Sequence, residues 1–145
     1  RLGVAVRGGV AERHLERVLA GDPSVAQVTP IDADGKPDFR VVTTDGREVL
    51  IECKTASAHR YKDGAHKVEA QKTRDSGAGR QYTFDQFDVL AACLFSSTGL
   101  WEYRFRWTRD LQASPSDDSR IRPVQRVDGR WARSFGELLG GAAQS

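Results

Sequence analysis

Hydrophobic and polar positions along this chain follow two different periods. Apolar residues recur every three or four positions between Val10 and Ala20, which predicts an amphipathic helix that Gly21-Asp22-Pro23 ends. Short apolar or alternating stretches separated by turn residues follow it and are typical of strands. The expected strands are residues 25–31, 39–43, 48–54, 88–95, 100–107 and 124–127, and Ser134 to Glu137 is a capping box that opens a short helix.

Two segments lack a clear period. Residues 55–81 are polar and basic, and they predict a long loop, or a loop with a short helix near 65–74. Loops of that length often carry function. Residues 112–120 are rich in Ser, Asp and Pro and predict another loop. In residues 101–107 aromatic side chains alternate with charged ones, which favours a half-buried strand over a base-stacking surface.

The order of these elements predicts the fold class. A helix, three strands, a linker, two strands and a helix indicate an α/β domain with a mixed central sheet. The 145 residues are enough for one compact domain with a real core, and net charge is only +2. The chain contains no methionine. We therefore expect residues 1–145 to be a single domain excised from a longer protein.

The cysteines and the apolar runs indicate the compartment in which the protein works. Cys53 and Cys93 lie inside apolar runs, without the spacing of a disulfide framework or a zinc site. We expect both to be buried, in a protein of the reducing cytoplasm. No signal peptide and no apolar run of membrane-spanning length is visible, so no membrane partner is expected.

The informative chemistry lies on the expected strand 48–54. Side chains on a strand alternate between its faces, so Glu52 and Lys54 point one way. Val49, Ile51 and Cys53 then form an apolar face that can pack on a helix. The sequence therefore predicts a carboxylate and an ammonium side by side on the polar face.

A second carboxylate precedes the hairpin. Asp45-Gly46 is a hairpin turn that returns strand 48–54 beside strand 39–43, and this pairing can bring Asp38 next to Glu52. Two carboxylates in one site repel each other unless a cation lies between them, and oxygen ligands suit Mg²⁺. A lysine beside them can orient or deprotonate a water that attacks a phosphodiester.

Pro37-Asp38 followed by Glu52-Cys53-Lys54 resembles the PD-(D/E)xK signature of restriction-endonuclease-like nucleases. The resemblance covers roughly residues 8–110. It implies a restriction-endonuclease-like core with a mixed sheet of four to six strands flanked by α-helices. It also implies Mg²⁺, or Mn²⁺ as a substitute, held by Asp38, Glu52 and the carbonyl of Cys53, with Lys54 serving the attacking water.

Gly8-Gly9-Val10-Ala11-Glu12 resembles the first helix of the same superfamily, which often carries a glutamate. On a helical wheel Glu12 lies about twenty degrees from Leu19, at the border of the buried face, whereas Glu16 lies nearer solvent. Glu12 is therefore the candidate for an additional catalytic residue and metal ligand. A solvated helix glutamate is the alternative.

The segment after Lys54 is basic. Residues 54–82 hold seven Lys or Arg against three Asp or Glu. By resemblance Gln71, Lys72 and Arg74 approach the scissile phosphate, and Lys67 and Arg80 are further candidates for backbone contacts. The Gln-x-x-x-Tyr box of exonuclease branches is missing because position 75 is Asp. If this segment is only solvated, the arginines of 104–133 are the alternative groove.

These observations predict a Mg²⁺-dependent DNA endonuclease of restriction or phage defence. A nuclease-like module that binds nucleic acid without cutting it, and a structure-selective resolvase or RNA nuclease on the same fold, remain alternatives. The expected partners are DNA, further domains of the parent protein and a second copy of the chain in a homodimer.

Overall fold

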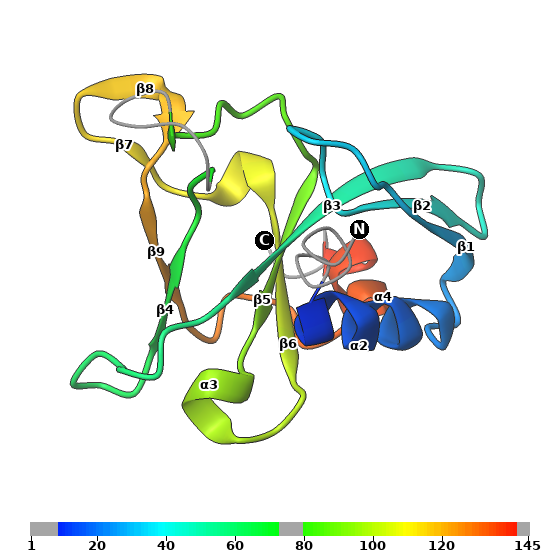
Figure 1. The fold of residues 1–145 in the computed structure, drawn as a ribbon, viewed down its shortest axis with the longest axis horizontal. Helices are drawn as coiled ribbons and strands as arrows, with labels where there is room; N and C mark the ends of the chain where they lie inside the picture. The colour runs from blue at the N-terminus through cyan, green and yellow to red at the C-terminus, as the bar shows by residue number, and fades with distance from the viewer. Residues whose placement is uncertain (1–8, 73–79, 142–145) are drawn as a thin grey trace.

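The computed structural model describes residues 9–72 and 80–141 (Figure 1). Its helices are α2 (Gly9–Ala20), α3 (Phe95–Thr98) and α4 (Phe135–Leu139), with a 3-10 turn η2 (Thr108–Asp110). Its strands are β1 (Val25–Pro30), β2 (Phe39–Thr43), β3 (Glu48–Thr55), β4 (His66–Glu69), β5 (Val89–Cys93), β6 (Tyr103–Trp107), β7 (Ala113–Ser114), β8 (Asp117–Ile121) and β9 (Val124–Val127).

The central sheet has five strands in the order β1-β2-β3-β5-β6. The pair β3–β5 is parallel and the other three pairs are antiparallel, so the expected mixed sheet is confirmed. The hairpin between β2 and β3 turns at Gly46, whose φ of 88° is a conformation that glycine adopts without steric cost. The parallel pair needs a long crossover, which residues 56–88 supply.

One face of the sheet packs on helices. Val49, Ile51 and Cys53 of β3 belong to the core cluster that also holds Leu15 and Leu19 of α2. Phe135 and Leu138 of α4 complete this layer, and α2 and α4 lie together on this side of the sheet (Figure 1). The alternation of β3 predicted this face correctly, because a strand must bury its apolar positions together.

The other face is covered by strands rather than by helices. The two-stranded ribbon β4–β9 contributes Val68 and Val127 to a second core cluster, together with Leu90 and Trp131. Among the described residues, the expected flanking helices α2 and α4 therefore pack on one face of the sheet. The ribbon replaces a helix because its strands pair with each other and bury one apolar face on the sheet.

Three local expectations are also corrected. Residues 66–69 form a strand and not part of a helix near 65–74, because β9 pairs with them. Residues 113–121 form the pair β7–β8 instead of a loop. Residues 95–98 form the short helix α3. No helix among the described residues has the length and apolar character needed to cross a lipid bilayer.

Candidate active site

Asp38 is fixed against the end of β3 by the backbone. Its N–H donates to the carbonyl of Ile51 at 3.0 Å, and its Oδ2 accepts the N–H of Cys53 at 2.8 Å. β2 begins at Phe39, and its regular pairing with β3 stops there. Beyond this point the Asp38 carboxylate, and not a β2 carbonyl, accepts the backbone N–H of β3. Asp38 is therefore placed directly beside the Glu52-Cys53-Lys54 tripeptide.

Glu52 and Lys54 lie together on the face of β3 opposite α2. Lys54 Nζ is 3.6 Å from Glu52 Oε2, and the two side chains are only 15% and 10% exposed. Burial this deep is unusual for both residue types unless they are paired or functional. The structure thus gives Glu52 and Lys54 the common orientation that the alternation predicts.

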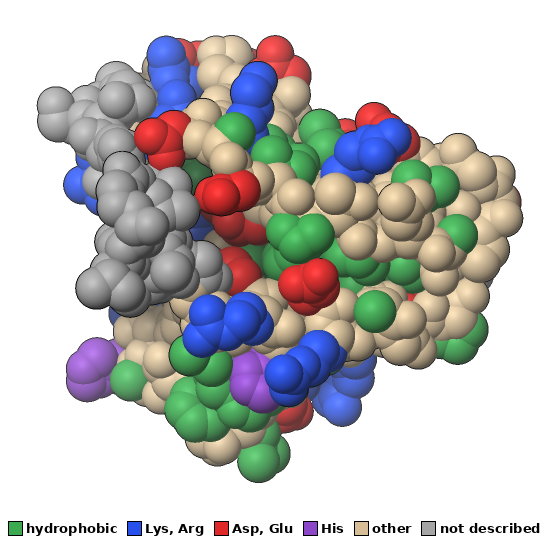
Figure 2. Space-filling model, turned by 45° about the vertical axis from the view of Figure 1, so that its right-hand side comes forward, with side chains coloured by type: hydrophobic (Ala, Val, Ile, Leu, Met, Phe, Trp, Pro, Cys, Tyr) green, Lys and Arg blue, Asp and Glu red, His purple; other side chains and the backbone are tan. Residues whose placement is uncertain are grey.

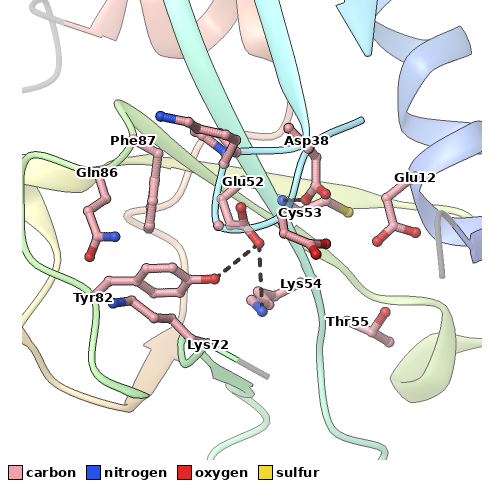
Figure 3. Close-up of a pocket in the computed structure, with 15 residues that line it drawn as sticks. Glu12, Asp38, Glu52, Cys53, Lys54, Thr55, Lys72, Tyr82, Gln86 and Phe87 are labelled. Carbon is pink, nitrogen blue, oxygen red and sulfur yellow. Dashed lines mark hydrogen bonds and ion pairs between the residues drawn. The ribbon is translucent and has the colours of Figure 1, made fainter. Parts of the chain in front are cut away.

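These residues line one pocket of about 530 Å³ (Figure 3). The predicted residues Glu12, Asp38, Glu52, Cys53, Lys54 and Lys72 all contribute to its wall. In Figure 3 the side chain of Asp38 lies between those of Glu52 and Glu12, in agreement with the electrostatic influence of Asp38 on both glutamates. Figure 2 shows acidic side chains gathered on one face, with Lys and Arg side chains around them.

Tyr82 is a pocket residue that sequence reasoning did not assign to the site. Its hydroxyl donates to Glu52 Oε2 at 3.3 Å, and its ring lies 5.5 Å from Lys54 Nζ. Gln86 and Phe87 follow it in the pocket wall. In the sequence, the only indication of this position was that Tyr82 is an aromatic residue at the end of the basic segment 54–82. Thirty positions separate Tyr82 from Glu52, so only folding shows the contact.

Glu12 enters the pocket from α2, whereas Glu16 is not among the lining residues. The Glu12 side chain folds back over the start of its helix. A Cβ added at Gly9 would lie 2.5 Å from Glu12 Oε1, and Gly9 has a φ of 63°. Glycine at position 9 therefore provides both the backbone conformation and the space for this carboxylate.

The two glutamates of the pocket have raised pKa values. Burial and then the negative charge of Asp38 raise the pKa of Glu52 to about 8, although Lys54 and Tyr82 act in the opposite direction. Burial also raises the pKa of Glu12, with a contribution from Asp38. Excess negative charge is thus costly in this pocket, and a bound cation would relieve that cost.

The donor set fits Mg²⁺ in chemical type. No three Asp, Glu, His or Cys side chains among residues 9–72 and 80–141 form a ready-made metal cluster. Mg²⁺ does not need one, because it usually keeps several waters and is bound through one or two carboxylates plus substrate phosphates. Asp38 and Glu52, with the carbonyl of Cys53, supply oxygen atoms of that kind. Cys53 itself is buried, as is Cys93.

The fold places the residues that were expected to contact phosphate in different environments. Lys72 lines the pocket, and its backbone exchanges hydrogen bonds with Arg80, whose Nε donates to the Lys72 carbonyl at 3.0 Å. Gln71 forms a bridge with Gln81 and is not among the lining residues. Lys67 lies over the ring of Tyr61 at 4.9 Å, also outside the pocket. Arg74 lies outside the described residues.

The fold is similar to that of a solved nuclease. The structure of a bacterial homing endonuclease, I-Ssp6803I, superposes with a TM-score of 0.53, at 21% sequence identity, over 92% of this chain and 91% of that chain. At this identity the likeness shows the fold alone: a mixed α/β arrangement shared along nearly the whole of both chains. Neither a protein-family model nor a curated protein sequence matches this chain.

Proposed function

We propose that this chain is a Mg²⁺-dependent endonuclease of the PD-(D/E)xK type that hydrolyses phosphodiester bonds of DNA. The observation that carries the proposal is the placement of Asp38, Glu52 and Lys54 in one pocket. A pair of carboxylates with a neighbouring ammonium is a set that suits metal-assisted phosphodiester hydrolysis. The fold shared with a homing endonuclease supports the same reading.

The carboxylates have a binding role in this proposal. Asp38 and Glu52, with the Cys53 carbonyl, would hold the metal, and Glu12 would act as a further ligand or orient one. When bound, Mg²⁺ supplies positive charge that offsets the charge on the phosphate. Asp38 is held ready for this role by the Cys53 N–H. Glu52 must lose its proton first, since its pKa is about 8.

Lys54 has the proton-handling role. Its Nζ lies at the pocket wall, 3.6 Å from Glu52 Oε2, where the ammonium can orient an attacking water by donating a hydrogen bond, and the neutral amine can accept a proton from it. Tyr82 donates a hydrogen bond to the same Glu52 oxygen and so restricts the side chain's orientation. Lys72, across the pocket, supplies positive charge for the phosphate backbone.

The biological setting belongs to the same proposal. The resemblance of the Asp38, Glu52 and Lys54 motif to restriction-type nucleases supports a role in restriction or phage defence, and the spacing of Cys53 and Cys93 supports a reducing cytoplasm. Further domains of a parent protein, or a second copy of this chain, would then provide sequence recognition.

A cleavage assay tests the proposal. Supercoiled plasmid, linear duplex, single-stranded DNA and RNA are incubated with the protein in Mg²⁺, Mn²⁺, Ca²⁺ and excess chelator. Nicking or linearisation of plasmid in Mg²⁺ or Mn²⁺, weaker activity in Ca²⁺ and none in chelator are expected. Undiminished cutting in chelator would contradict the mechanism. Binding without cutting in every metal would favour the inactive binding module, and cutting of RNA alone would favour the RNA nuclease.

A further inference from the structure

A second pocket of about 360 Å³ lies at the end of the β4–β9 ribbon, and it differs in character from the acidic one. β4, β6, β9 and the segment after β9 provide its wall. The charged and titratable side chains that line it are Asp63, His66, Arg104, Arg126, Asp128 and Arg133. Its floor includes Trp131, which is 5% exposed and anchored by a hydrogen bond from Nε1 to the carbonyl of Arg126.

The two aspartates of this pocket are already neutralised. Asp63 pairs with Arg126, and Asp128 pairs with Arg126 at 3.4 Å and with Arg130 at 2.8 Å. Hydrogen bonds from these arginines lower the pKa of both carboxyl groups, that of Asp128 to about 2. Arg126 and Arg130 therefore compensate the acidic groups of the lining and leave the charge of Arg133 in excess, since Arg104 pairs with Glu102.

Arg104 and Arg133 are the remaining cationic side chains of the lining. Arg104 is only 18% exposed, and its guanidinium contacts Glu102 at 3.5 Å and the carbonyl of Tyr103 at 3.0 Å. Arg133 is exposed, and among the described residues its guanidinium makes no ion pair or hydrogen bond. A half-buried arginine and an exposed one therefore meet in one concave site with donors available for an anion.

His66 adds a neutral donor to this wall. Ser97 Oγ accepts from Arg60 Nε at 2.9 Å and lies 2.8 Å from His66 Nδ1. When the Ser97 hydroxyl donates to Nδ1, the neutral ring carries its proton on Nε2, where it can donate to a ligand. Burial lowers the pKa of His66, and Arg60 and Arg104 lower it further. An anion bound beside Arg104 would act in the opposite direction and raise that pKa.

We propose that this second pocket binds a backbone phosphate of the nucleic acid, held by Arg104 and Arg133 with His66 as a hydrogen-bond donor. The inference rests on the proposed function, because that function supplies the polyanion. Guanidinium groups match the oxygens of phosphate through paired N–H donors, which lysine cannot reproduce. The site would fix the register of the substrate and not take part in the chemistry.

The chain connects the two pockets over a suitable length. His66 lines the second pocket and Lys72 lines the acidic one, with six steps of extended chain between them. Six residues span at most about 20 Å, which corresponds to about six base pairs of B-form DNA. The proposal requires both pockets to face one duplex, so that a strand in the acidic pocket presents a phosphate several nucleotides away to Arg104 and Arg133.

Salt-dependent binding tests the proposal. A duplex is titrated in chelator, to prevent cutting, with the wild type, Arg133→Gln, Arg104→Gln and Arg104→Lys, at several salt concentrations. Each Gln variant should lower the slope of log K against log salt by about one, because one phosphate contact is lost. Arg104→Lys should keep the slope but weaken binding. Arg17→Gln, an exposed arginine of α2 that lines neither pocket and lies outside residues 104–133, is the matched control.

An NMR titration of His66 gives a readout independent of cutting. Duplex DNA should raise the pKa of His66 in the wild type and not in Arg133→Gln. Without DNA the pKa of His66 should be lowered alike in both proteins, which shows that the variant is folded. A response to inorganic phosphate but not to DNA would overturn the proposal in favour of a free-phosphate site. Unchanged slopes in both Gln variants would overturn it as well. If the wild type binds no nucleic acid, the proposed function fails first, and this inference falls with it.

Discussion

The carboxylate of Asp38 accepts the backbone N–H of Cys53, the middle residue of the Glu52-Cys53-Lys54 tripeptide, at 2.8 Å. This bond joins the end of the loop before β2 to the end of β3. The bond fixes the position of Asp38, one proposed metal ligand, relative to the backbone of β3, which carries the other ligand, Glu52. Asp38 consequently has two separable roles, one in the hydrogen bonding of the fold and one through its charge.

Asp38→Asn separates these roles. The amide oxygen still accepts from Cys53, so the free energy of unfolding should stay within about 1 kcal/mol of wild type. Loss of the charge should lower plasmid cutting by at least about 100-fold. Asp38→Ala should lose activity and also about 1–3 kcal/mol of stability, because a buried N–H is left unpaired. Asp32→Asn, exposed in the same loop, is the control. Urea unfolding and a nicking time course measure both effects.

Glu52→Gln should stabilise the metal-free protein at high pH. The folded pKa of Glu52 is about 8 against 4.5 for an ordinary glutamate, so the unfolded state ionises first as pH rises. Stability therefore falls between about pH 4.5 and 8, and the amide escapes this loss. Tm at pH 9 should rise by about 3 °C or more, with no gain at pH 4. Glu48→Gln, exposed on the same strand, is the control. Equal gains at both pH values would refute the assignment.

Lys54→Met should act on the chemistry rather than on docking. The methionine preserves the buried stem but removes the ammonium beside Glu52. Cutting should fall by about 10²–10⁴-fold, while duplex binding measured by gel shift survives. Lys62→Met removes an exposed lysine that lines neither pocket and should leave both assays unchanged. Normal cutting with lost binding would make Lys54 a docking residue.

The two glutamates of α2 should differ. Glu12 lines the acidic pocket and Glu16 does not. Glu12→Gln should reduce metal affinity or activity by about 10–100-fold, as expected when a ligand or its orienting partner is removed. Isothermal titration with Mn²⁺ and the nicking assay provide the two measurements. An activity loss in Glu16→Gln alone would show that Glu16, one turn further along α2, is the functional glutamate and that Glu12 is not.

Lys72 and Lys67 form a matched pair on one segment. Lys72 lines the acidic pocket, whereas Lys67 lies over Tyr61 at 4.9 Å. Lys72→Gln should flatten the salt dependence of duplex binding by about one unit of slope. Lys67→Gln should leave it unchanged, against the expectation from sequence that both lysines contact the backbone. Slopes equal to that of the wild type in both variants would mean that this basic segment does not track the substrate.

The sequence by itself determined the hairpin from Phe39 to Thr55 and the faces of its second strand. Alternation requires Glu52 and Lys54 to share one side of β3 and Val49, Ile51 and Cys53 the other, whatever surrounds the strand. The tight turn at Gly46 then places β2 beside β3. These features are local, with few residues between the partners, and the structure has them as expected.

Only the tertiary structure decided what covers the pocket. Residues 66–69 become a strand because Val127 and its neighbours pair with them, and that partner is almost sixty residues away. Tyr82 reaches Glu52 across thirty positions, and Trp101 stacks between His14 and Phe95 outside the strand that alternation assigned to it. Polar segments have no period of their own, so long-range pairing and burial choose their conformation.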